Sequence, residues 1–177
     1  EHRTRTAFGS SGTLRGAKGH IHEGGIRVPG IVRWPGVVSA GSECDEPING
    51  TDWLPTFSGI AGAALPDGRP LDGTNVLPAL VKGEKLERET PLFWWLWHAR
   101  GGFEVAMRDG DYKIAATMVP QSKPGDIADA KQPDGWTIME FIRKADLDRF
   151  ELFDLSKDPS EIRNLVFHNR QNVPRET

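Results

Sequence analysis

The stretch LRGAKGHIHEGGIRVPGIVRWPG, from Leu14 to Gly36, decides how the N-terminal part of this chain is interpreted. It places Lys18 among glycines, follows it with two histidines and a glutamate, and then enters an apolar segment. Glycine loses more backbone entropy on ordering than any other residue, so this many glycines need a reason. Two interpretations are open: a solvated surface turn, or an anion site whose backbone approaches a ligand closely.

Lys18 is the candidate anion-binding residue. Its ammonium is a compact charge with three donors, which suits a tetrahedral oxyanion, and Arg15 could add a planar guanidinium. The glycine spacing and the missing Lys-Ser/Thr pair exclude a phosphate-binding P-loop. His20 and His22 would share one face of a strand and could meet one metal, but a metal site needs three or four ligands. The residues alone support an anion-binding loop, with a solvated turn as the alternative.

Composition restricts the class of protein. The chain has 177 residues, 20 glycines, 13 prolines and a net charge of -3, which predicts many loops and gives no broad basic field for nucleic acid. The single cysteine, Cys44, excludes an internal disulfide framework and a thiolate zinc site. No apolar run reaches membrane-spanning length, and no signal peptide is present. The first residue is Glu1, so we expect a chain processed or cut from a longer one.

Three elements are expected in the first half. Residues 26–34 are β-branched and apolar, which predicts a strand, and Pro29 makes it an edge strand or interrupts it. Residues 51–63 have helical spacing of apolar side chains and Gly62 as a stop, and residues 75–83 predict a second short helix.

The second half changes character after the charged linker at residues 84–90. The expected elements are strands at 91–99, 103–110 and 111–119, a helix at 137–147, a strand at 151–155 and a short helix from Pro159 or Ser160. Asp109-Gly110-Asp111 is a hairpin signal. We therefore predict an α/β edge followed by a small α+β subdomain.

An aromatic strand ends at His98. Trp94, Trp95 and Trp97 offer either core packing or two sugar-stacking faces. No Gly-x-Ser-x-Gly, His-Glu-x-x-His or calcium-loop pattern occurs in the sequence.

The opening stretch resembles the second signature region of the type I sulfatases, which are arylsulfatase-like members of the alkaline-phosphatase-like superfamily. The matched positions are Leu14, Arg15, Gly16, Lys18, Glu23, Gly24, Gly25, Arg27, Pro29, Trp34, Pro35 and Gly36. The segments TDWLPTFSGIAGAALP, RPLDGTNVLPALVKG, EVAMRDGDYKIA and ELFDLSKDPSEIRNLV are similar to later family segments. The resemblance covers nearly the whole chain, except about residues 120–148.

The resemblance implies a fold and a set of site residues. Residues 1–84 would be the C-terminal portion of the large sulfatase α/β domain, and residues 85–177 a C-terminal antiparallel β subdomain with a helix. Lys18 would contact the sulfate group as a catalytic residue. The candidate substrate-binding residues are His98, Arg15, His20 and His22.

The resemblance also implies what this chain lacks. Family members use a Cys or Ser in Cys-x-Pro-Ser-Arg, oxidised to formylglycine, as the nucleophile, beside calcium or magnesium held by Asp/Asn ligands. Cys44 lacks that context, and the last two metal ligands are expected just upstream of Glu1. We therefore expect no metal ligands in this chain, a missing N-terminal catalytic part and no turnover by the fragment alone. An exported location, periplasmic, secreted or lysosomal, is the family expectation.

Three functions stay open at this point. The chain could be a fragment of a sulfuric-ester hydrolase acting on a sulfated carbohydrate or an aryl sulfate. It could be a non-catalytic module that binds sulfated glycans or a protein through Lys18, Arg15 and the tryptophan strand. It could also belong to a phosphate-ester or phosphonate hydrolase of the same superfamily. Alone, the fragment is expected to self-associate through residues 26–34.

Overall fold

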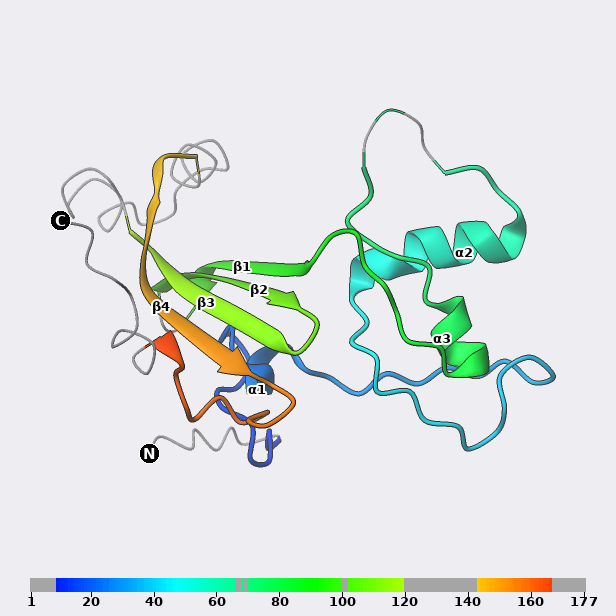
Figure 1. The fold of residues 1–177 in the computed structure, drawn as a ribbon, viewed down its shortest axis with the longest axis horizontal. Helices are drawn as coiled ribbons and strands as arrows, with labels where there is room; N and C mark the ends of the chain where they lie inside the picture. The colour runs from blue at the N-terminus through cyan, green and yellow to red at the C-terminus, as the bar shows by residue number, and fades with distance from the viewer. Residues whose placement is uncertain (1–8, 66–67, 69, 100–101, 120–142, 167–177) are drawn as a thin grey trace, which may run out of the picture. The chain divides into compact units, whose positions relative to one another are not determined.

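The computed structural model describes residues 9–65, 68, 70–99, 102–119 and 143–166 (Figure 1). The chain forms two compact units, Glu1–Arg27 with Phe93–Thr177, and Val28–Leu92. The contacts thus group the opening segment with the C-terminal sheet. The domain division predicted from the sequence, 1–84 and 85–177, concerns a larger protein and stays a prediction.

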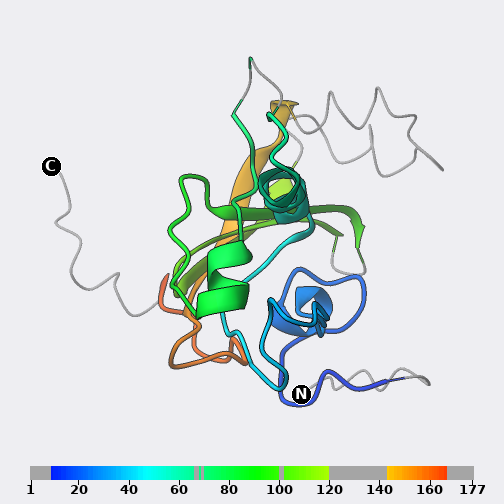
Figure 2. The same cartoon turned by 90° about the vertical axis from the view of Figure 1, so that its right-hand side faces the viewer.

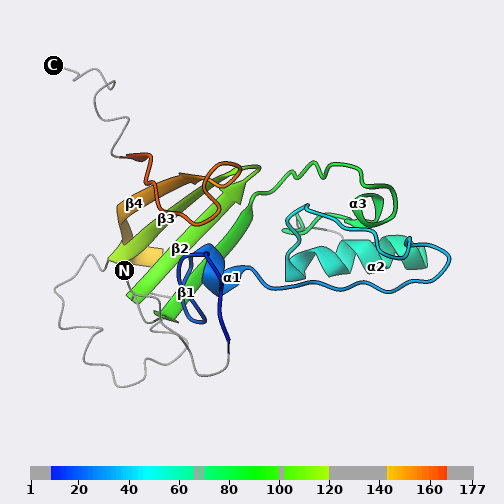
Figure 3. The ribbon, with the colours of Figure 1, turned by 90° about the horizontal axis from the view of Figure 1, so that it is seen from below.

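A four-stranded sheet forms the centre of the first unit (Figures 1 and 3). Its strands, in the spatial order β1-β2-β3-β4, are β1 (Leu92–Ala99), β2 (Gly102–Asp109), β3 (Tyr112–Val119) and β4 (Asp146–Asp154). β3 is antiparallel to both β2 and β4. The mixed class with an antiparallel sheet is confirmed, as are the three strands predicted between residues 91 and 119.

The predicted hairpin between β2 and β3 is also confirmed. Gly110 has a φ of 55°, a left-handed conformation that glycine adopts at little cost. Asp109 pairs with Tyr112, and Arg108 therefore lies directly opposite Lys113. The tight turn thus places two cationic residues side by side on the sheet.

β4 is longer than predicted and contains a bulge. Ala115 pairs with Glu151, but Thr117 pairs with Asp148, so β4 holds one extra residue there. Arg149 within this bulge has a φ of 52°. The helix predicted at 137–147 is wrong at its end, because Asp146 and Leu147 belong to β4, where they pair with β3. Residues 120–142 lie outside the described part of the chain.

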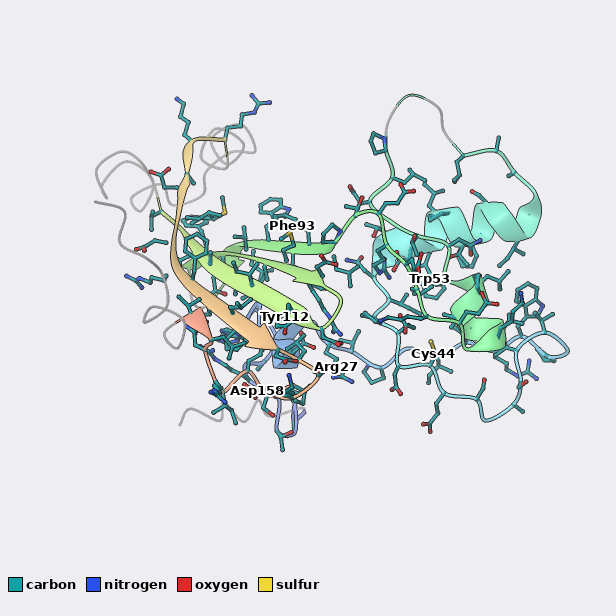
Figure 4. The ribbon with its side chains drawn as sticks, in the orientation of Figure 1. Arg27, Cys44, Trp53, Phe93, Tyr112 and Asp158 are labelled. Carbon is teal, nitrogen blue, oxygen red and sulfur yellow. The ribbon has the colours of Figure 1, made fainter. Side chains whose placement is uncertain are left out.

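A short helix, α1 (Glu23–Ile26), and the loop before it cover one face of the sheet (Figures 1 and 3). Ile21 enters this face and contacts Ala106 and Ala115, with Trp94 and Leu96 packed against the cluster. Side chains alternate along β1, so Phe93 is 55% exposed on the opposite side (Figure 4). The predicted core packing is confirmed for Trp94, whereas Trp95 is exposed and its predicted stacking on a sugar stays a prediction.

The strand predicted at residues 26–34 is wrong. Ile26 ends α1, and the residues after it form no strand. Val28 is 77% exposed and Ile31 93% exposed. A strand needs a hydrogen-bonded neighbour, none lies beside this segment in the described residues, and Pro29 removes one donor. Self-association of the fragment through this exposed segment stays a prediction.

In its described residues the second unit holds two α-helices (Figure 2). They are α2 (Trp53–Ala61), preceded by the 3-10 turn η1 (Gly50–Asp52), and α3 (Leu77–Lys82). Gly62 and Gly83 follow the two helices with φ values of 64° and 68°, which confirms both as helix stops. None of the helices in the described residues is long and apolar enough to cross a membrane.

Asp52 holds this unit together. Its buried carboxylate accepts two hydrogen bonds from Arg88, at 2.7 and 2.8 Å, and one each from the Asn49 and Thr74 backbone N–H groups. Burial by itself raises the pKa of Asp52, but these donors outweigh it and hold the pKa below the ordinary 3.8. The ionised form is therefore the stabilising one.

The lowered pKa of Asp52 predicts acid sensitivity. Because the folded pKa is below the unfolded one, the stabilisation is present above about pH 4 and is lost as the pH falls through the folded value. Asp52→Asn should lower stability at pH 7 and flatten the loss below pH 4. Chemical unfolding measured from pH 7 to 2 tests this, with exposed Asp72→Asn as the control. Parallel curves for Asp52→Asn and the wild type would contradict it.

Candidate functional site

Lys18 occupies a tight turn spanning Ala17–His20. The His20 N–H donates to the Ala17 carbonyl oxygen at 3.0 Å, and Gly19 has a φ of 87°, which a residue with a side chain rarely adopts. Lys18 is exposed, and its ammonium has no ion-pair partner within the described part of the chain. The turn therefore presents a positive charge that an anion can reach.

The His20 ring closes the same turn. Its Nδ1 lies 3.0 Å from the Ala17 carbonyl oxygen and 3.3 Å from the Ala17 nitrogen. With a proton, Nδ1 donates to the carbonyl oxygen; without one, it accepts from the Ala17 N–H. Either tautomer ties the ring to the backbone beside Lys18. A substrate contact by His20 stays a prediction.

The glycine pair after the histidines has a packing role. The Gly24 N–H donates to the Arg15 carbonyl oxygen at 2.7 Å, and a Cβ on Gly24 would lie 2.6 Å from that oxygen. A Cβ on Gly25 would overlap the His20 carbonyl oxygen and lie 2.6 Å from that of Ala17. These glycines let the loop carrying Lys18 lie directly on α1. The glycines are needed for a close approach, but the groups that they approach are the protein's own backbone carbonyls and not a ligand.

Gly25→Ala is therefore expected to destabilise the protein by about 1–3 kcal/mol, the usual range for overpacking. The neighbouring groups are backbone carbonyls, which cannot rotate away as a side chain could. Thermal unfolding measures the change. Gly30→Ala is the matched control, because a Cβ there meets no atom within 4 Å. Equal melting temperatures for the two variants would refute the packing role.

A buried cluster of charges lies beneath the loop. The Lys113 side chain is fully buried, and its Nζ donates to the Ile21 carbonyl oxygen at 2.9 Å and to Glu23 Oε1 at 3.0 Å. The same Nζ forms an ion pair with Glu161 Oε1 at 2.9 Å. A buried ammonium needs such partners, since an isolated charge in the interior costs several kcal/mol.

Glu161 joins the cluster from the turn after β4. Its Oε2 accepts the Glu23 N–H at 2.6 Å, and its own N–H donates to the carbonyl of Asp158, which Figure 4 labels. Burial raises the pKa of Glu161, but the nearby His22 ring, the charge of Lys113 and the hydrogen bond from the Glu23 N–H outweigh it and lower the pKa. Glu161 is therefore ionised opposite Lys113 at neutral pH.

The short helix predicted from Pro159 or Ser160 is wrong, and the cause is the position that Glu161 takes in the cluster. Glu161 has a φ of 54°, which no residue of a right-handed helix can have. The contacts of its carboxylate with Lys113 and Glu23 hold this conformation. A tertiary interaction has overridden a local helical pattern.

Arg15 and His22 also face the sheet. Arg15 Nη1 lies 3.0 Å from Glu151 Oε1, and the guanidinium stands over the Phe153 ring at 5.8 Å. The buried His22 ring lies between two carboxylates, with Nδ1 3.5 Å from Glu161 Oε2 and Nε2 3.8 Å from Glu151 Oε2. The structure thus gives both residues contacts within the protein, and their roles toward substrate stay predictions.

Beside His22 is a small polar cavity of about 20 Å³, lined also by Glu104, Thr117 and Arg149. It has room for about one water molecule and none for a sulfate ester. The exposed turn, and not this cavity, is the candidate contact for an anionic group.

Comparison with known proteins finds sulfatases that are similar to this chain. No protein-family model matches the chain. Arylsulfatase A of Bos taurus is 34% identical over 170 residues, covering 89% of this chain and 30% of the relative. Steryl-sulfatase of Homo sapiens is 50% identical over 82 residues, covering 46% of this chain and 14% of the relative. The chain is similar to sulfatases over most of its length.

A solved structure supports the fold of this chain. It comes from work on glycosaminoglycan metabolism by Bacteroides thetaiotaomicron, and it covers 90% of this chain and 29% of that one, with a TM-score of 0.59 and 24% identity. This chain spans less than a third of the length of the arylsulfatases and steryl-sulfatases that it matches. It corresponds to a C-terminal part of a sulfatase.

Three further predictions about the sulfatase site concern residues away from the turn. His98 lies on β1, in a part of the strand whose side chains are outside the description. Cys44 is exposed and carries a free thiol. In the residues that the structure describes, no group of three or more His, Cys, Asp or Glu side chains could hold a metal ion. The predicted calcium or magnesium therefore has no fitting ligand set in these residues.

Lys113 and Glu161 are the residues that sequence reasoning missed. A signal for Lys113 was available, because it is the one charged residue of β3, whose sequence is YKIAATMV. Two residues before Ala115, it must share that residue's inward face. Glu161 gave no such signal, because a charged residue in a polar turn is ordinarily solvated.

Proposed function

We propose that the complete protein containing this chain hydrolyses a sulfuric ester, and that Lys18 binds the sulfate group. The observation that carries the proposal is the Lys18 turn: an exposed ammonium on a loop whose backbone rests on buried charges. The family relationship supports sulfate as the group that this ammonium meets.

The chemistry of Lys18 follows from its charge. As the bond between sulfur and the leaving oxygen breaks, its electron pair goes to the leaving oxygen, where negative charge grows beside the charge that the sulfuryl oxygens already carry. Because the backbone of its turn is already fixed, the Lys18 ammonium can stabilise this charge with little reorganisation. Formylglycine as the nucleophile and calcium or magnesium beside it are implied by family resemblance, and both would come from outside the described residues of this chain.

The substrate is proposed to be a sulfated carbohydrate or an aryl sulfate. The similarity to arylsulfatase A and steryl-sulfatase supports an organic sulfate ester. Phe93 and Trp95 of β1 are exposed on the other face of the sheet and are not assigned to this substrate. Arg15, His20, His22 and His98 remain candidates for contacts with the rest of the substrate.

The experiment is an assay of the complete protein with an aryl sulfate and with the matching aryl phosphate. Faster turnover of the sulfate supports the proposal, and faster turnover of the phosphate would favour a phosphate-ester hydrolase. Binding of a sulfated glycan with no turnover of either ester would favour a binding module. The isolated 177-residue chain is expected to turn over neither ester, and measurable hydrolysis by it would overturn the expected dependence on the rest of the protein.

A further inference from the structure

We propose that Lys113 and Glu161 are positioning residues that hold the Lys18 turn in its working conformation. The inference rests on the proposed function for its consequence in catalysis. Both residues are distant from Lys18 in the sequence, but the sheet brings them beneath the loop that carries Lys18. The geometry connects the three through a continuous series of contacts.

The first contacts join the sheet to the start of α1. Lys113 Nζ holds the Ile21 carbonyl oxygen and the Glu23 carboxylate, and Glu161 accepts the Glu23 N–H. Both the side chain and the backbone of Glu23 are therefore fixed. Glu23 is 3% exposed, so water cannot readily replace these partners.

The next contacts join α1 to the turn. Gly24 and Gly25 follow Glu23 directly and pack against the carbonyl groups of Arg15, Ala17 and His20. Those carbonyls belong to the loop that forms the Lys18 turn. A shift of Glu23 would be transmitted to Lys18 because backbone packed on backbone cannot absorb it by rotating a side chain.

Electrostatics explain why a carboxylate is needed at Glu23. Arg108 and Lys113 lie directly opposite each other in the β2–β3 register, and like charges in that position repel. Glu23 faces both, with Oε1 3.0 Å from Lys113 Nζ and Oε2 4.0 Å from Arg108 Nη1. The loop is therefore stabilised in the position where the Glu23 carboxylate lies near both Lys113 and Arg108.

Glu161→Gln in the complete protein tests the inference. Gln has nearly the same shape but no charge, so it weakens the hold on Lys113 without leaving a cavity. The matched control is Glu84→Gln, which removes the exposed ion pair with Lys82. We expect hydrogen exchange at the His20 amide to become at least about 10-fold faster in Glu161→Gln and to stay unchanged in the control.

A double-mutant cycle on aryl sulfate hydrolysis gives the catalytic readout. Glu161→Gln should lower kcat/KM by about 10-fold with Lys18 present, since misplaced catalytic groups lose rate steeply. In the Lys18→Ala background the same substitution should lower kcat/KM by less than about 2-fold. A general loss of stability would lower kcat/KM by the same factor in both backgrounds, and that result would overturn the positioning role.

The exchange measurement separates this inference from the proposed function. If Lys18→Ala leaves hydrolysis unchanged, the proposed function fails, but faster exchange at His20 still supports the positioning role. Unchanged exchange in a folded Glu161→Gln protein overturns it whatever the activity. Should Glu161→Gln not fold, Glu23→Gln, which weakens the hold on the same ammonium, decides by the same two measurements.

Discussion

Lys113→Met is expected to lower the free energy of unfolding of the complete protein by about 3–5 kcal/mol, the usual effect of breaking a buried charge cluster by removing one partner. Methionine fills most of the space of the lysine stem, so the loss comes from charge and not from a cavity. It leaves the Glu23 and Glu161 carboxylates buried without their shared cation. Chemical unfolding, followed by a signal from the sheet, measures the change.

Lys157→Met is the control for this prediction. Lys157 also pairs with a carboxylate, that of Asp154 at 2.6 Å, but its side chain is 80% exposed. Water replaces the lost partner there, so no measurable change in stability is expected. If the two variants lost the same stability, burial of the Lys113 cluster would not matter energetically.

Lys18→Ala in the complete protein is expected to lower kcat for sulfate-ester hydrolysis by about 10²–10³-fold. That is the usual cost of removing one preorganised group that stabilises charge in the transition state. Because Lys18 is exposed and the turn is closed by backbone groups, the stability of the variant should equal that of the wild type. Steady-state kinetics and thermal unfolding, measured together, test both statements.

Two comparisons sharpen the Lys18 result. Lys18→Arg keeps the charge but changes its shape and donor geometry, so it should recover part of the lost rate. Lys85→Ala removes an exposed lysine of the other unit and should leave kcat unchanged. A rate in Lys18→Ala within twofold of the wild type would remove Lys18 from the mechanism.

The elements predicted from sequence and confirmed by the structure are those whose signals are local. The strand Leu92–Ala99, the turn at Gly110 and the stops at Gly62 and Gly83 depend on neighbouring residues. The family resemblance likewise rests on short ordered motifs. For these features the local pattern and the tertiary fold agree.

The failed predictions are those that needed a distant partner. Residues 26–34 have the composition of a strand but no neighbouring strand in the described residues, so Val28 and Ile31 stay exposed. The helix predicted from Pro159 or Ser160 is replaced by a turn because Glu161 reaches a lysine 48 positions earlier in the chain, at Lys113. Local propensity cannot report either fact.

The sequence by itself determined the resemblance to the sulfatases, the hairpin turn at Gly110 and the glycine-rich loop that carries Lys18. Only the tertiary structure decided why that loop has its conformation. Gly24 and Gly25 are required by backbone packing, and the loop is anchored on the buried Lys113 between Glu23 and Glu161. The physical reason is that a buried charge must have partners, and which groups become its partners depends on how the sheet brings distant residues together.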